Sequence, residues 1–94
     1  MMSEIPINLL KVKKANIDKE ILRVGIIAEL DAINLYEQLA ESTENMDIKK
    51  VILDIAKEEK THVGEFQALL LNLDKQQVVE LEAGKKEVEK ELKD

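Results

Sequence analysis

Several residue types and patterns are missing from this chain of 94 residues, and each absence excludes a class of protein. There is no cysteine, so the sequence contains no disulfide framework, no thiolate zinc site and no cysteine-ligated iron centre. The only proline is Pro6, near the N-terminus. No run of about 18 apolar residues occurs, and the N-terminal stretch lacks the pattern of a secretory signal. We therefore expect a soluble, untargeted cytoplasmic protein without a membrane span.

Positive charge is also in deficit. The sequence has 14 Lys and Arg residues against 20 Asp and Glu residues, which gives a net charge of -6. A chain this acidic is repelled by the phosphates of nucleic acids and anionic membranes, so neither is an expected partner, whereas cations are attracted. A single domain of 94 residues buries a modest share of its surface, so we also expect self-association.

The sequence does contain a helical periodicity over most of its length. Apolar residues recur at intervals of three and four from about Ile17 to near Thr43, with Asn16 or Asp18 as the expected N-cap. A polar turn follows, in which Asp47 is the expected N-cap of a second helix. The second periodic segment consists of Ile48, Ile52, Ile55, His62, Phe66, Leu69 and Leu73.

A third helix is predicted to begin after Asp74, because Asp74 and Gln77 have the spacing of a capping box. The prediction is therefore an all-α protein. An antiparallel two-helix hairpin occupies residues 17–73, a short C-terminal helix occupies residues 74–94, and residues 1–16 form an N-terminal arm. The arm is either a short extended piece or a docking segment.

Three potential metal ligands lie within the apolar helix faces. Glu59 and His62 form a Glu-x-x-His motif, whose two side chains lie on one side of a helix. Glu29 and Glu59 have their midpoint at position 44, inside the predicted turn, so the hairpin brings the two carboxylates to the same height. Burying an unpaired charge there is unfavourable unless a cation neutralises it. The three residues therefore predict a metal site.

This set of ligands is half of a two-metal site. Ferritin-like carboxylate bundles use one glutamate from each of two helices and a Glu-x-x-His motif from each of the other two. The chain has one of each, so a second copy related by a two-fold axis would complete the site. The hairpin would then be half of a ferritin-like four-helix bundle that is completed by dimerisation. Carboxylates with one imidazole per metal suit iron or manganese, and iron is our first choice.

Simpler interpretations compete with this one. A Glu-x-x-His motif is common by chance in a charged helix, where both side chains are usually solvated. Tyr36 follows Glu29 by seven residues, so the geometry favours a core aromatic about two turns from the site. Glu65 lies three residues after His62 and is either an exposed charge or a hydrogen-bond partner of the imidazole.

Two segments at fixed spacing, residues 28–37 (AELDAINLYE) and 58–62 (EEKTH), resemble the encapsulated ferritins, especially their archaeal members. These are half-ferritins housed in encapsulin nanocompartments. The resemblance covers roughly residues 18–82. It implies a ferroxidase whose homodimers share a centre with two iron ions and assemble into a ring-shaped homodecamer within the encapsulin shell. Such a protein oxidises Fe(II) to Fe(III) with dioxygen or peroxide, for iron mineralisation and storage.

The resemblance also assigns residues to roles. Glu29, Glu59 and His62 match the family's iron ligands, and Tyr36 matches a tyrosine close to the iron centre, so all four are expected to be catalytic. Two other functions remain open. One is a metal-stapled helical assembly module without turnover, and the other is a rubrerythrin-like di-iron protein that reduces peroxide. A plain helical interaction domain with an incidental motif is the simplest alternative.

The chain departs from the family pattern in two places. Relatives can carry an acidic residue at the position of Ala28 and a tryptophan at that of Leu35. With an acidic residue at the position of Asp31 these form a second metal site, which is not expected here because only Asp31 is present. Residues 85–94 are charged and lack an apolar docking peptide, so the chain is either a domain of a shell fusion or a cargo recruited in another way.

Overall fold

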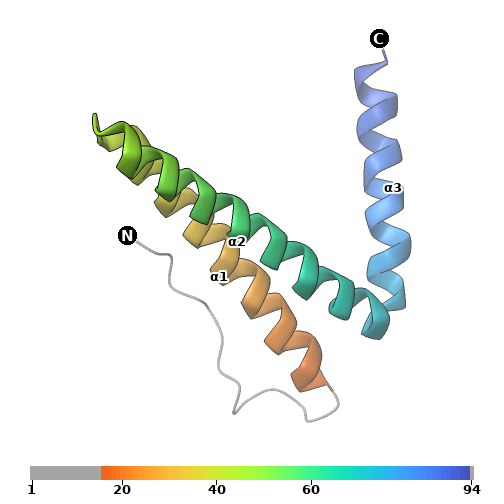
Figure 1. Ribbon diagram of the computed structural model, residues 1–94. Helices are drawn as coiled ribbons and strands as arrows, with labels where there is room; N and C mark the ends of the chain where they lie inside the picture. The colour runs from red at the N-terminus through yellow and green to blue at the C-terminus, as the bar shows by residue number, and fades with distance from the viewer. Residues whose placement is uncertain (1–15, 94) are drawn as a thin grey trace.

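The computed structural model describes residues 16–93, which are entirely helical apart from short connections (Figure 1). The elements are α1 (Ile17–Ser42), α2 (Met46–Leu73) and α3 (Lys75–Leu92). Helices α1 and α2 lie side by side in antiparallel directions, whereas α3 points away from them and makes few contacts with either. The predicted all-α hairpin with a C-terminal helix is confirmed. The predicted N-terminal arm lies outside the described residues, except for Asn16.

The turn between α1 and α2 is shorter than predicted, because Asn45 and not Asp47 caps α2. The side-chain oxygen of Asn45 accepts hydrogen bonds from the backbone N–H groups of Asp47 at 3.0 Å and Ile48 at 3.1 Å. These N–H groups have no partner within the helix, so Asn45 stabilises its first turn. The carboxylate of Asp47 instead lies within the first turn of α2, where the helix dipole favours a negative charge. Asn16 precedes α1 without a capping side-chain hydrogen bond.

Asp74 connects all three helices. Its backbone N–H donates to the Leu70 carbonyl at 2.9 Å, which closes the end of α2. One carboxylate oxygen accepts from the Gln77 backbone N–H at 3.0 Å, so the predicted cap of α3 is present. The other accepts from Nη2 of Arg23 in α1 at 2.9 Å. This residue therefore fixes the connection between α2 and α3 and ties it to α1.

The hairpin buries little within one chain. Among the described residues, the buried hydrophobic core consists of Ile33, Ala40, Ala56 and Leu70. The radius of gyration is 16.7 Å, whereas a compact domain of this length has a value of about 12 Å. Many large apolar side chains are exposed as a result. No helix in the described part combines the length and the hydropathy that a membrane crossing requires.

The predicted apolar stripe of α2 is only partly buried within one chain. Three of its members are about half exposed: Ile48, Leu69 and Leu73. Ala56 and Leu70 take buried positions instead. Ala56 and Leu70 lie at one edge of this stripe, so the side of α2 that α1 covers is rotated from the predicted one.

Candidate metal centre

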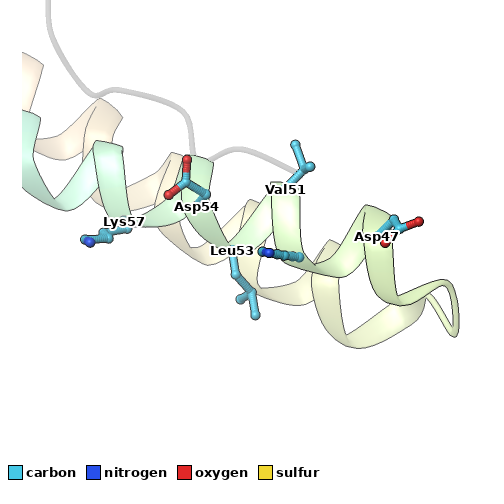
Figure 2. A pocket seen from close by; sticks show the side chains of 6 residues that line it. Asp47, Val51, Leu53, Asp54 and Lys57 are labelled. Atoms are coloured by element: carbon cyan, nitrogen blue, oxygen red, sulfur yellow. The ribbon is translucent and has the colours of Figure 1, made fainter.

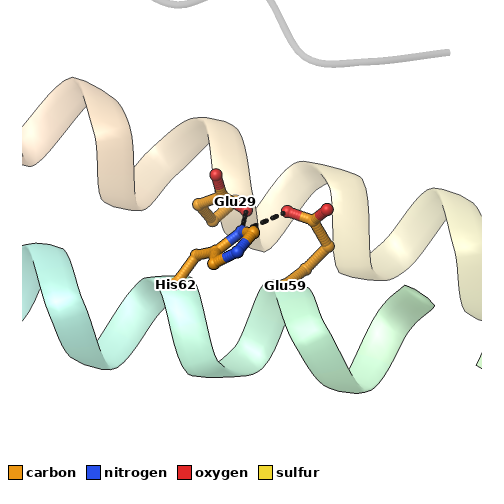
Figure 3. Close-up of side chains that lie close together, drawn as sticks. All are labelled: Glu29, Glu59 and His62. Carbon is orange, nitrogen blue, oxygen red and sulfur yellow. Dashed lines mark hydrogen bonds and ion pairs between the residues drawn. The ribbon is translucent and has the colours of Figure 1, made fainter. Parts of the chain in front are cut away.

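The structure brings the three predicted ligands together near the middle of the hairpin (Figure 3). Glu29 projects from α1, and Glu59 and His62 project toward it from consecutive turns of α2. One carboxylate oxygen of each glutamate and one ring nitrogen of His62 all lie within 4.8 Å of one another. Within the described part of the chain, no other three His, Cys, Asp or Glu residues converge in this way.

The Nδ1 atom of His62 faces both carboxylates. It lies 3.4 Å from Oε2 of Glu29 and 3.4 Å from Oε2 of Glu59. Both distances are long for a hydrogen bond, and a single ring nitrogen has one hydrogen or one lone pair, so it cannot satisfy both oxygens well. A metal ion bound at about 2.0–2.4 Å from each atom would satisfy all three, since ligands of one ion lie up to about 4.8 Å apart. The spacing therefore fits a shared cation.

The electrostatics also favour a cation. The side chains of Glu29 and Glu59 are only 19% and 18% exposed. Two carboxylates this close repel each other, and the repulsion is stronger where water is partly excluded. A divalent ion neutralises both groups. Carboxylate oxygens with one imidazole suit iron or manganese, whereas structural zinc sites favour thiolates or several imidazoles.

The cluster is open on one side. The His62 side chain is 43% exposed although both carboxylates are largely covered. Three protein donors are fewer than the six that an octahedral ion accepts, and no fourth acidic, His or Cys side chain of the described residues joins them. Further ligands must therefore come from solvent, from substrate or from another subunit.

Other predicted residues lie outside the cluster. Tyr36 is half-buried in α1 and lies about 10 Å along the helix axis from Glu29, so it is not a ligand in this arrangement. Glu65 is exposed and is not one of the carboxylates that face His62, so the alternative of an exposed charge is confirmed.

A contact that the sequence analysis missed lies one turn from the cluster. The ring of Phe66 in α2 packs against the backbone of Gly25 in α1. Its only sequence signal is a glycine inside a helix, one turn before Glu29. The signal is weak, because glycine also occurs in helices without such contacts: Gly64 and Gly84 have open space around them.

A shallow hollow elsewhere on the surface does not resemble the metal cluster. It lies on the outer face of α2 near the turn, and side chains of a single helix line it (Figure 2): Asp47, Lys50, Val51, Leu53, Asp54 and Lys57. Its labelled side chains diverge from one another instead of converging on a point. Its charges are mixed in sign, and its residues do not belong to the group of three that could hold a metal ion.

Comparison with known proteins agrees with this geometry. Residues 20–93 match the rubrerythrin family. The chain is 66% identical over 73 residues to the ferritin-like-encapsulin shell fusion protein of Pyrococcus furiosus. This alignment covers 78% of this chain and 21% of that protein. It is 41% identical over 56 residues to the encapsulin nanocompartment cargo protein EncC of Myxococcus xanthus. That alignment covers 60% of this chain and 43% of EncC. The chain thus spans about a fifth of the first relative and less than half of the second.

A solved structure covers nearly the whole chain. The crystal structure of the encapsulated ferritin domain from Pyrococcus furiosus is 54% identical in sequence and matches with a TM-score of 0.81. The match covers 96% of this chain and 94% of that one, so it includes α3 as well as the hairpin. The chain belongs to the rubrerythrin family and, within it, to the encapsulated ferritins.

Proposed function

We propose that the protein is a ferroxidase that oxidises Fe(II) to Fe(III) at a di-iron centre shared by two subunits. The observation that carries this proposal is the convergence of Glu29, Glu59 and one ring nitrogen of His62 within 4.8 Å, in a cluster with one open side. Membership of the rubrerythrin family supports a ferritin-like use of these ligands. The proposed reaction follows from the number and charge of the metal ions that these side chains can bind.

The ligands of two subunits match the charge of two ferrous ions. A dimer would supply Glu29 and Glu59 twice, hence four carboxylates, together with two neutral imidazoles. Four negative charges balance two Fe(II) ions. Oxidation leaves two positive charges in excess of these four carboxylates. Each carboxylate has two oxygens, so it can bind one ion or bridge two.

The electrons come from the substrate, and the side chains do not change oxidation state. Two Fe(II) ions supply two electrons, which with two protons reduce one dioxygen molecule to hydrogen peroxide. With peroxide as the oxidant, two electrons and two protons give two water molecules. The role of Glu29, Glu59 and His62 is to hold the two ferrous ions close together, so that both electrons are available to one oxidant.

We also propose the partners of the reaction. A homodimer would close over the open side of the cluster, and the exposed apolar side chains offer surface for assembly into a ring-shaped homodecamer. Two helices side by side cannot enclose a mineral store, so Fe(III) must accumulate outside the protein. An encapsulin nanocompartment in the cytoplasm would retain it, and the names of both curated relatives include encapsulin.

The direct test is anaerobic loading of the whole protein with Fe(II), followed by air. We expect Fe(III) absorbance to develop faster than in buffer, and Glu59→Ala or His62→Ala to abolish the acceleration. Glu58→Ala is the matched control, because Glu58 is the exposed neighbour of Glu59 and does not belong to the cluster. If the two ligand variants oxidise Fe(II) as fast as the wild type, the proposal is wrong.

A metal-stapled assembly module is the second candidate, because a half-site with an open side serves equally well to hold two subunits together. It predicts that a chelator dissolves the oligomer while Fe(II) in air is oxidised no faster than in buffer. The oligomer mass and the oxidation rate, measured on the same sample, distinguish the two functions. Replacing air by anaerobic peroxide then separates a ferroxidase that uses dioxygen from a rubrerythrin-like reducer of peroxide.

A further inference from the structure

Gly25 stands where glycine is unfavourable. It lies inside α1, one turn before Glu29, and glycine weakens a helix interior relative to alanine. Its backbone conformation does not require glycine either, because no glycine among the described residues has a positive φ. The reason for glycine must lie in what surrounds it.

What surrounds it is the ring of Phe66. A Cβ atom added to Gly25 would lie 3.0 Å from each of the ring atoms Cδ1, Cε1 and Cζ. Carbon atoms in good contact are about 3.5–4.0 Å apart, so an alanine would push the ring or the whole of α2 away. Gly25 thus lets α2 approach α1 more closely than any other residue would. Gly64 and Gly84 have nothing within 4 Å of the same added atom, so this contact distinguishes Gly25.

The contact lies directly beside the metal cluster. Gly25 is one turn before Glu29 on α1, and Phe66 is one turn after His62 on α2. One helical turn is about 5.4 Å and is stiff over that length, so the helix separation at Gly25 also governs the separation of Glu29 from His62. Metal–ligand distances tolerate changes of about 0.2 Å. A displacement of a few tenths of an ångström at Gly25 is therefore large for the site.

We propose that Gly25 and Phe66 form a spacer that sets the distance between the two sides of the metal site. In this role Gly25 is a positioning residue, which acts on the ligands through the separation of α1 and α2 and touches no metal itself. The inference rests on the proposed metal site and adds a determinant of its geometry. It explains why a glycine lies inside the helix that carries Glu29.

The test measures Co(II) binding to the whole protein under anaerobic conditions, where no turnover occurs. The dissociation constant and the visible absorption of bound Co(II) report the ligand geometry. We expect Gly25→Ala to weaken binding by about tenfold or more, the range found when the surroundings of metal ligands are altered, and to change the spectrum. Gly64→Ala is the matched control: it lies two residues after His62 but in open space, so it should bind like the wild type.

A double variant separates spacing from a general loss of structure. Adding Phe66→Leu to Gly25→Ala removes the clash, and we expect the wild-type affinity and spectrum to return. Should Gly25→Ala fail to fold, Phe66→Ala is measured instead, since it removes the spacer above an intact Gly25 and should also weaken binding. Wild-type affinity in Gly25→Ala, or in Phe66→Ala when that replaces it, overturns the inference. A wild-type protein that binds no Co(II) contradicts the proposed function instead.

Discussion

Asp74 accepts a hydrogen bond at 2.9 Å from Nη2 of Arg23, which lies 51 positions earlier in the chain and on another helix. The same carboxylate caps α3 by accepting from the Gln77 backbone N–H. The Gln77 hydrogen bond and, after it, the Arg23 guanidinium hold the pKa of Asp74 below its usual value of 3.8. The direction of α3 thus depends on an ionised carboxylate at the junction of all three helices.

This pKa predicts an acid sensitivity with a definite sign. Because the folded-state pKa is depressed, the ionised Asp74 stabilises the folded protein above pH 3.8. That stabilisation is lost as the pH falls from 3.8 through the lower folded-state pKa. In Asp74→Asn the capping oxygen is retained but the charge is gone. We expect urea unfolding to show that the stability difference between wild type and variant shrinks as the pH falls below 3.8, and a constant difference would contradict the prediction.

The two glycines in open space offer a test of stability without effects on the site. Alanine at Gly64 in α2 or Gly84 in α3 meets nothing within 4 Å. Each substitution should therefore stabilise the protein by about 0.5–1 kcal/mol, because alanine reduces the conformational entropy of the unfolded chain and suits a helix better. Chemical denaturation of each variant measures this gain. A loss of stability at either position would show that the glycine contacts something in the assembled protein.

The hairpin and its cluster were predictable because both follow from helix geometry. A period of about 3.6 residues identified the helices, and the register of an antiparallel pair placed Glu29 opposite Glu59 without further information. The predicted N-cap of α2, Asp47, is wrong, because Asn45 and Asp47 are both good capping residues and the sequence does not distinguish them. The choice depends on which side chain reaches the free N–H groups, and that is a property of the folded turn.

Two features could not be read from periodicity at all. The approach of Phe66 to Gly25 depends on how closely the two helices lie, and the period of the apolar residues carries no information about that distance. The exposure of Leu69 and Leu73 is the second feature, because an apolar pattern identifies one side of a helix and does not say whether the same chain covers it.

Tyr36 gives a prediction that separates binding from oxidation. It lies about 10 Å from Glu29 along α1, so Tyr36→Phe should leave the Co(II) dissociation constant unchanged. If Tyr36 is catalytic, as its resemblance to a family tyrosine implies, the variant oxidises Fe(II) more slowly at the same metal occupancy. Stopped-flow absorbance after mixing with oxygenated buffer measures this rate. An unchanged rate removes Tyr36 from the catalytic residues and leaves it the role of a core aromatic.

Replacing a metal ligand should change the thermal stability of the protein in opposite directions with and without metal. In the metal-free protein Glu29 and Glu59 repel each other across a partly covered site, so Glu59→Gln should match or exceed the wild type in thermal stability. With Mn(II) at about 100 times its dissociation constant, binding should stabilise the wild type by about 2.7 kcal/mol, which Glu59→Gln largely loses. Thermal unfolding with Mn(II) and with a chelator measures the stability of the wild type and of Glu59→Gln under both conditions. An incidental Glu-x-x-His motif predicts no response to Mn(II) in either protein, so the reversal of the stability order is specific to a metal site.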